Sequence, residues 1–275
     1  MRARKYGNAL RLPVKVTLNA DILPVSAFSG AQVTATARSL FLALMLRALP
    51  NTLTMCNLVA GCCAIAALFE GMPVLTLILA IVSLIMDLLD GFLARRLKVS
   101  SPLGVQLDSL ADVISFGVVP GCILFVLLQP DGEDSGWSEW MPYASFLFTA
   151  GVSLRLAKFN IDTRDSSVFH GLPSPSAATL VFGLLWMQVS YHPWWVSMHT
   201  PLLLYALILL LPLLMLSNLR LWSMKGIHHP NGKMILIGFL AVFALLILFT
   251  GSAAVLLLVV LYILFGLANV MLKFY

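Results

Sequence analysis

Long apolar runs separated by short polar stretches dominate the chain. One of them, "PLLLYALILLLPLLMLSNL" (Pro201–Leu219), contains no charged residue, and similar runs recur from residue 50 onward. A helix crosses a bilayer with about 20 apolar residues, whereas the strands of a membrane barrel alternate apolar and polar positions. The pattern predicts an all-α, polytopic membrane helical bundle with about eight transmembrane helices, near residues 50–69, 73–95, 103–128, 142–161, 174–190, 201–218, 233–249 and 252–272.

The N-terminal part has a different pattern. Residues 1–36 are basic and mixed in polarity, which predicts a cytosolic tail without a fixed fold. Their first 35 residues lack the apolar core and cleavage site of a signal peptide. The weaker apolar stretch at 37–49 has arginines at its ends, Arg38 and Arg47, and predicts an amphipathic helix at the membrane surface.

Composition supports a membrane location. The chain is 60% hydrophobic and 11% charged, with a mean hydropathy of +0.96, whereas a soluble domain carries about 25% charged residues. With the N-terminus in the cytosol, all 17 Lys and Arg fall on the cytoplasmic side, and the acidic loop 129–141 falls outside. We expect a multi-pass protein with both termini cytoplasmic, best suited to a bacterial-type plasma (inner) membrane. The net charge of +5 reports this orientation and contact with anionic lipid, not nucleic-acid binding.

Four aspartates interrupt the apolar pattern in two pairs. Asp87 and Asp90 are three residues apart, and Asp108 and Asp112 are four apart, so each pair occupies one face of a helix. The segment between the pairs, "GFLARRLKVSSP", carries three cations, two serines and a proline, and predicts a short connection. The two helices are then antiparallel, and the four carboxylates meet near their connected ends.

Such a cluster needs cations nearby. A carboxylate inside a membrane helix costs at least about 2.5–3.5 kcal/mol, and four together repel one another. Hard divalent ions prefer oxygen ligands, and four carboxylates suffice for two ions roughly 3.5–4 Å apart. Buried salt bridges to Arg95, Arg96, Lys98 or Arg155 and a path for protons or cations are the alternatives. The small residues Gly91, Ala94 and Gly104 beside the aspartates, with Arg95 to meet phosphate, favour a ligand site.

The spacing of these residues resembles a known family signature. Asp87-x2-Asp90-Gly91-x2-Ala94-Arg95, then eight residues, then Gly104-x3-Asp108-x3-Asp112, is similar to that of the CDP-alcohol phosphotransferases at all eight fixed positions. The resemblance covers about residues 50–178. Members of that family replace CMP in a CDP-linked lipid or alcohol with an incoming hydroxyl group.

The resemblance implies roles for particular residues. Asp87, Asp90 and Asp108 would be the main ligands of two divalent cations, Mg²⁺ or Mn²⁺, and Asp112 would contribute to the second and act as the general base. The CDP moiety would be bound by the residues at the matching positions, Gly91, Ala94, Arg95, Ser101 and Gly104. Ser101, followed by a proline, also fits a helix N-cap. The resemblance also implies a homodimer.

An upstream stretch adds two candidates for the donor site. "LPNTLTMCNLVAG" (Leu49–Gly61) is similar to the opening helix of many family members, and it places Thr54 and Asn57 where they would meet cytidine. Hydrogen bonds between helices are the alternative for both residues.

Three further stretches concern the acceptor. "SFGVVPG", "RLAKFNI" and "GLPSPSAA" resemble the membrane-embedded phosphatidylserine synthases, which use CDP-diacylglycerol and L-serine. The candidate serine-binding residues are Ser115, Arg155, Lys158 and Asn160. Lys158 stands where that branch has arginine, and thus loses the planar fork. A cationic pocket binds a serine carboxylate, but it equally suits glycerol 3-phosphate or an inositol phosphate as acceptor. Arg155 and Lys158 could also simply anchor the helix at lipid headgroups.

The expected organisation has four parts. After the tail (1–36) and the surface helix (37–49) come a catalytic core over residues 50–190 and C-terminal transmembrane helices over residues 191–275.

Overall fold

The computed structural model describes residues 30–99, 101–129, 139–161, 169–190, 194–217 and 220–221. The chain divides into two compact units, Met1–Met45 and Leu46–Tyr275. In the first unit, the described residues belong to the start of a helix. The second unit contains all the candidate site residues and is described below.

Helix α1 (Gly30–Phe69) is continuous and contains Pro50 in its interior. The predicted boundary between a surface helix and a first span at residue 50 therefore lies inside one helix, and the helix already begins within the predicted tail. Placement of residues 37–49 at the membrane surface stays a prediction. Residues 1–29 lie outside the described part.

Helix α2 (Pro73–Leu97) runs back along α1 after a tight turn in which Gly71 takes a positive φ of 72°. It ends at Lys98, whose left-handed conformation lets its N–H bond to the carbonyls of Ala94 and Arg95. Helix α3 (Pro102–Asp112) starts directly afterwards, with Ser101 as its N-cap. This is the short connection that the sequence predicts between the two aspartate pairs.

The third span is a composite of three helical segments. After α3 comes the π-helix η2 (Val113–Val118), which continues into α4 (Val119–Leu127). The wider turn is visible in the bond from the Val119 N–H to the Ile114 carbonyl, five residues earlier. The prediction of one uniform helix over 103–128 misses this insertion, because no local residue pattern marks it.

The remaining described elements are helices close to the predicted positions, with one exception, and two very short strands that the sequence does not predict. They are the 3₁₀-helix η3 (Met141–Ser145), α5 (Phe146–Ile161), α6 (Ser174–Ser190), α7 (Trp194–Leu216), and the two-residue antiparallel strands β1 (Phe169–His170) and β2 (Arg220–Leu221). Helix α7 begins inside the stretch 191–200, which the sequence predicts as a loop.

The all-α membrane fold is confirmed, but the count of eight spans stays a prediction. Among the described residues, three helical stretches are long and apolar enough to cross a membrane: Ala48–Phe69, Pro73–Leu97 and Pro102–Leu127; Pro201–Leu216 is apolar but shorter. The predicted spans 233–249 and 252–272 lie outside the described residues.

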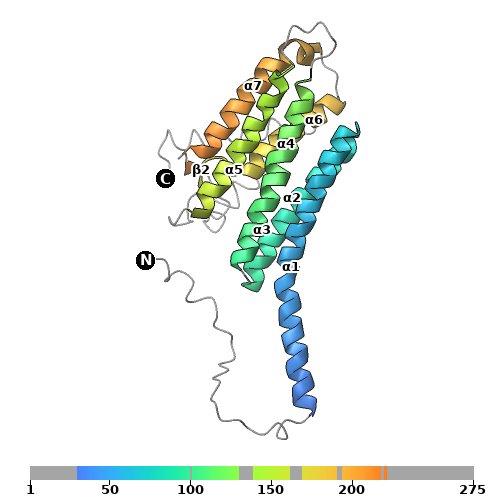
Figure 1. The fold of residues 1–275 in the computed structure, drawn as a ribbon, viewed down its shortest axis with the longest axis vertical. Coiled ribbons are helices and arrows are strands. Elements are labelled where there is room, and N and C mark those ends of the chain that lie inside the picture. The colour runs from blue at the N-terminus through green and yellow to red at the C-terminus, as the bar shows by residue number, and fades with distance from the viewer. Residues whose placement is uncertain are drawn as a thin grey trace, which may run out of the picture. The chain divides into compact units, whose positions relative to one another are not determined.

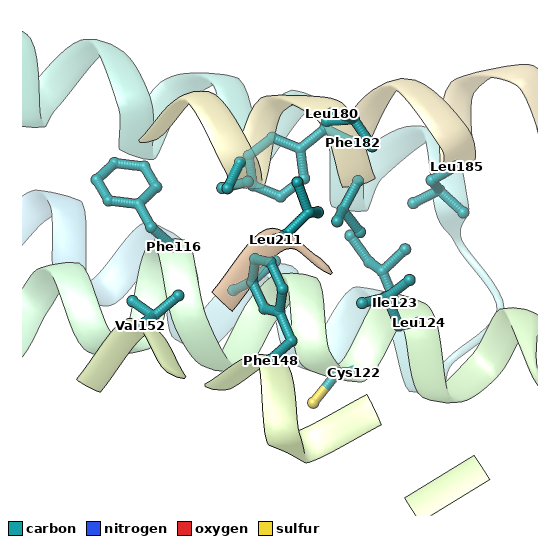
Figure 2. Close-up of a cluster of buried hydrophobic side chains, with 14 of the residues drawn as sticks. Phe116, Cys122, Ile123, Leu124, Phe148, Val152, Leu180, Phe182, Leu185 and Leu211 are labelled. Carbon is teal, nitrogen blue, oxygen red and sulfur yellow. The ribbon is translucent and has the colours of Figure 1, made fainter. Parts of the chain in front are cut away.

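The core of this unit lies between η2 and α4 on one side and α5, α6 and α7 on the others (Figure 1). Figure 2 shows Val152 of α5 next to Phe116 of η2, and Phe148 of α5 near Leu211 of α7. Helices approach closely where side chains are small, as membrane bundles require. A Cβ on Gly151 would collide with the ring of Pro212, so α5 and α7 touch at that point.

Candidate active site

Three aspartates from two helices have their carboxylates close together. Asp87 and Asp90 come from α2 and Asp108 from α3, and one carboxylate oxygen from each lies within 4.8 Å of the others. Asp90 is buried, with 4% of its surface exposed, and the other two are half-buried. The i, i+3 spacing in α2 and the short connection to α3 produce this convergence. Three carboxylates this close together carry more negative charge than Arg95, the cation that acts on Asp87 and Asp90, can neutralise.

Asp112 completes the group from the next turn of α3. Its carboxylate lies at hydrogen-bond distance from that of Asp87, a contact between two acidic groups that requires a shared proton or a cation. Its Oδ1 is buried and has no hydrogen-bond partner among the described residues. An unsatisfied buried acceptor costs about 1–3 kcal/mol. Together with the all-oxygen donor set, this unpaired atom fits a hard divalent cation.

Thr54 of α1 reaches the same site. Its hydroxyl donates a hydrogen bond of 2.6 Å to Oδ2 of Asp90 and also lies 3.0 Å from the Pro50 carbonyl of its own helix. The bond to Asp90 joins two helices, as the alternative for Thr54 expects, while its contact with cytidine stays a prediction.

Arg95 folds back along α2 toward the site. Its Nη1 lies 3.4 Å from the position that a Cβ on Gly91 would occupy, so the absence of a side chain at Gly91 leaves room for the guanidinium group. Ala94 lies on the same stretch of α2 and is half-buried. The end of α2 thus presents a cation and a short open surface next to the carboxylates, which suits an anionic ligand.

Ser101 caps α3, as the capping alternative expects. Its Oγ accepts a hydrogen bond of 2.9 Å from the Gly104 N–H. A Cβ on Gly104 would lie only 2.9 Å from Oδ1 of Asn51, so α1 approaches α3 closely here. Contact of Ser101 and Gly104 with the nucleotide stays a prediction.

Asn57 and Ser115 bond to each other. Oδ1 of the fully buried Asn57 accepts hydrogen bonds from Ser115 Oγ at 2.7 Å and from Ser83 Oγ at 2.5 Å. This geometry corresponds to the interhelical alternative for Asn57. It also engages the hydroxyl of Ser115, for which the sequence predicts a contact with serine. Ser83 is a further residue of this group that no motif identifies, although its position four residues before Asp87 puts it on the aspartate face of α2.

The three candidate acceptor residues on α5 have separate partners. Arg155 Nη1 donates to Ser174 Oγ at 3.0 Å, and Asn160 Nδ2 donates to Ser109 Oγ at 2.8 Å. Ser109 directly follows Asp108, so Asn160 joins the end of α5 to the aspartate helix. Lys158 Nζ lies 3.4 Å from the Leu216 carbonyl, at the C-terminal end of α7. Ser109 and Ser174 are further residues that spacing alone does not identify.

Comparison with known proteins agrees with these features. The pattern of the CDP-alcohol phosphatidyltransferase family matches residues 47–272. A CDP-diacylglycerol–serine O-phosphatidyltransferase of Helicobacter pylori is 35% identical over 186 residues, which cover 67% of this chain and 72% of the relative. Proteins of the same name from Methanocaldococcus jannaschii and Mycobacterium leprae are 32% identical over 167 residues (61% of this chain, 70% of the relative) and 34% over 163 (56% and 52%).

The family match begins just before Thr54 and includes both aspartate pairs and the α5 residues. It extends over most of the chain, including the composite third span. The resemblance noted from the signature spacing is thereby confirmed, and the family is one of phosphatidyltransferases rather than of ion transporters. This membrane protein belongs to the CDP-alcohol phosphatidyltransferase family.

Proposed function

We propose that the protein transfers the phosphatidyl group of CDP-diacylglycerol to the hydroxyl of L-serine, giving phosphatidylserine and CMP. The observation that carries the proposal is the convergence of Asp87, Asp90 and Asp108 within 4.8 Å, with Asp112 beside them. The names of the relatives support serine as the acceptor and CDP-diacylglycerol as the donor.

Two divalent cations fit this donor set. Asp87, Asp90 and Asp108, together with Asp112, would hold them, and both Mg²⁺ and Mn²⁺ accept carboxylate oxygens. When bound, such ions neutralise a diphosphate and stabilise the charge that develops as the phosphoryl group moves.

Asp112 is the proposed general base. Its buried Oδ1 has no partner among the described residues and is therefore free to take the proton of the serine hydroxyl. The serine oxygen then forms a bond to the β-phosphorus, which carries the diacylglycerol, and the bond from that phosphorus to the oxygen of CMP breaks. The proton resides on Asp112 and the negative charge leaves with CMP.

The donor and the acceptor would approach the cluster along different helices. The proposed contacts of CDP are Gly91, Ala94 and Arg95 on α2, and Ser101 and Gly104 at the start of α3. Thr54, which bonds to Asp90, is a further proposed contact. The exposed guanidinium of Arg95 suits the diphosphate. Arg155 and Lys158 would attract the serine carboxylate, and Asn160 would offer its amide oxygen to the ammonium group. For Asn57 and Ser115, the hydrogen bonds described above support an interhelical role instead.

We also propose a cytoplasmic site in a bacterial-type inner membrane. Arg95, Arg96 and Lys98 lie at the aspartate end of α2, which is the cytoplasmic end under the positive-inside rule. Both termini would be cytoplasmic and the enzyme a homodimer; the latter is carried over from the family resemblance.

The test is release of CMP from CDP-diacylglycerol by the purified protein with Mn²⁺ or Mg²⁺. Separate reactions contain L-serine, glycerol 3-phosphate, an inositol phosphate or no acceptor. We expect release that depends on L-serine and is lost in Asp112→Asn. Glu70→Gln, which alters an exposed carboxylate on the α1–α2 turn, is the control and should retain activity. Release that depends on another acceptor would overturn the serine assignment while keeping the chemistry.

A further inference from the structure

A second set of polar side chains is buried beneath the aspartates. Asn57 of α1, Ser83 of α2 and Ser115 of η2 are 0%, 0% and 2% exposed. Both serine hydroxyls donate to Oδ1 of Asn57, and Ser115 Oγ also lies 3.3 Å from the Asn57 carbonyl oxygen. These three residues, called here the asparagine layer, join α1 and α2, which carry site residues, to η2, which directly continues the aspartate helix α3.

Each member of the asparagine layer lies one helical turn from a residue of the site. Asn57 follows Thr54 by three residues, and Ser115 follows Asp112 by three. Ser83 precedes Asp87 by four residues on the antiparallel helix α2. In each case the layer residue lies farther from the α2–α3 connection than the site residue does. The asparagine layer is therefore deeper in the helical bundle than the carboxylates. Residues one turn apart on a helix keep a fixed spacing. The position of the asparagine layer therefore determines the position of the carboxylates.

The π-helix adds a reason for such a layer. Ser115 is one of its residues, and Asp112 immediately precedes it. A Cβ on Gly61 would lie 2.8 Å from Ser115 Oγ, so α1 contacts the π-helix closely on one side. On the other side, Thr149 of α5 donates a hydrogen bond of 2.9 Å to the Gly117 carbonyl. Asn57 of α1 and Thr149 of α5 thus hold the π-helix in place from two sides. Without such contacts its irregular backbone could shift in register.

We propose that Asn57 is a positioning residue: through Ser83 and Ser115 it sets the separation of α2 and η2 at which the four aspartates form one cation site. The proposal rests on the proposed function of those aspartates. Metal ligands must be held to within about half an ångström, and residues behind the ligands commonly provide this. Oδ1 alone makes the bridge, because Nδ2 of Asn57 is buried and has no hydrogen-bond partner among the described residues.

The experiment follows metal binding without turnover. Thermal unfolding of the purified protein is measured against Mn²⁺ concentration. The half-saturating concentration (Kd) is obtained by fitting the rise in Tm, which grows with the logarithm of the Mn²⁺ concentration above Kd. The variants are Asn57→Leu, Ser83→Ala and Ser115→Ala. The matched control is Ser145→Ala, which removes another buried serine hydroxyl, in η3. We expect Asn57→Leu, Ser83→Ala and Ser115→Ala each to raise the half-saturating Mn²⁺ concentration about tenfold or more, and Ser145→Ala to leave it unchanged.

A double-mutant cycle separates positioning from general stability. If the hydrogen bond between Asn57 and Ser115 acts on the cation site, Asn57→Leu/Ser115→Ala should bind Mn²⁺ no more weakly than Asn57→Leu alone. Variants with a lower Tm but the wild-type half-saturating concentration would overturn the proposal. If Asn57→Leu fails to fold, the half-saturating Mn²⁺ concentrations of Ser83→Ala and Ser115→Ala test the proposal in its place. A wild-type protein whose Tm does not respond to Mn²⁺ or Mg²⁺ would instead refute the proposed cation site, and with it this role for Asn57.

Discussion

The hydroxyl of Thr54 lies 2.6 Å from Oδ2 of Asp90, and both residues are almost completely buried. The most enclosed carboxylate of the cluster therefore has a neutral hydrogen-bond donor supplied by α1. This bond orients the carboxylate of Asp90 toward α1. Because α1 supplies the donor while α2 and α3 supply the carboxylates, the candidate site depends on three helices.

Removing this donor should weaken cation binding without unfolding the protein. We expect Thr54→Val to raise the Mn²⁺ concentration required for half-maximal CMP release by about 10–100-fold, because Asp90 loses its orienting bond. Thr54→Ser keeps the hydroxyl and should remain close to wild type. Thr52→Val is the control, since the exposed Thr52 hydroxyl donates to the Ala48 carbonyl of its own helix rather than to a carboxylate of the site. Equal Mn²⁺ requirements in all three variants would contradict the prediction.

Asp87→Asn should stabilise the protein in the absence of metal and make it less stable than the wild type when metal is present. Without divalent cations, the substitution relieves repulsion among carboxylates within 4.8 Å and should raise Tm, by about 2–4 °C for each kcal/mol relieved. At 100 times its Kd a cation stabilises the folded protein by about 2.7 kcal/mol, and the variant should lose most of this gain. Thermal unfolding with EDTA and with Mn²⁺ measures both effects. A variant that is less stable than wild type in EDTA would show that the carboxylates do not repel one another.

The two candidate roles of Ser101 can be separated by substitution. Asp caps a helix about as well as Ser, whereas Ala costs about 0.5–2 kcal/mol. We expect Ser101→Ala to lower Tm, and Ser101→Asp to keep the Tm of the wild type but to raise KM for CDP-diacylglycerol, because a carboxylate there would repel the diphosphate. Ser101→Asn, a neutral cap, is the control. An unchanged KM in Ser101→Asp would assign Ser101 to capping alone.

Two glycines of the signature should respond differently to alanine. A methyl group on Gly104 would press against Asn51 Oδ1 at 2.9 Å and Ser101 Oγ at 3.1 Å, so Gly104→Ala should cost about 1–3 kcal/mol of stability. A methyl group on Gly91 meets only the flexible Arg95 side chain, at 3.4 Å, and alanine favours the helix by about 1 kcal/mol. Gly91→Ala should therefore fold normally but bind CDP-diacylglycerol less tightly. Thermal unfolding and KM measurements distinguish the two.

The sequence predicts those features that depend on local spacing. The apolar runs predict helices, and the two aspartate spacings with a short basic connection predict that carboxylates from α2 and α3 converge. Ser101 could be recognised as a cap because Ser followed by Pro is a local signal at a helix start.

Features that depend on contacts distant in sequence were harder to predict. The partner of Ser115 is Asn57, 58 residues earlier. Nothing near Ser115 in the sequence indicates this partner, so the motif that contains Ser115 predicts a substrate contact instead. The π-helix has no residue signature of its own and is stabilised by Asn57 and Thr149 from other helices. Pro50 looked like a helix boundary, yet α1 continues through it, because a proline costs a helix one hydrogen bond without always ending it.

The lysine and arginines at the α2–α3 connection also affect how the chain enters a bilayer. Arg95, Arg96 and Lys98 and the nearby aspartates all lie at the connected end of this pair of helices, whereas the α1–α2 turn carries only Glu70. Translocating the α2–α3 connection would take all these charges through the lipid, while translocating the α1–α2 turn takes one carboxylate. Insertion as a hairpin led by the α1–α2 turn is therefore the route of lower energy. The carboxylates of the site then never have to cross the hydrophobic layer during biogenesis.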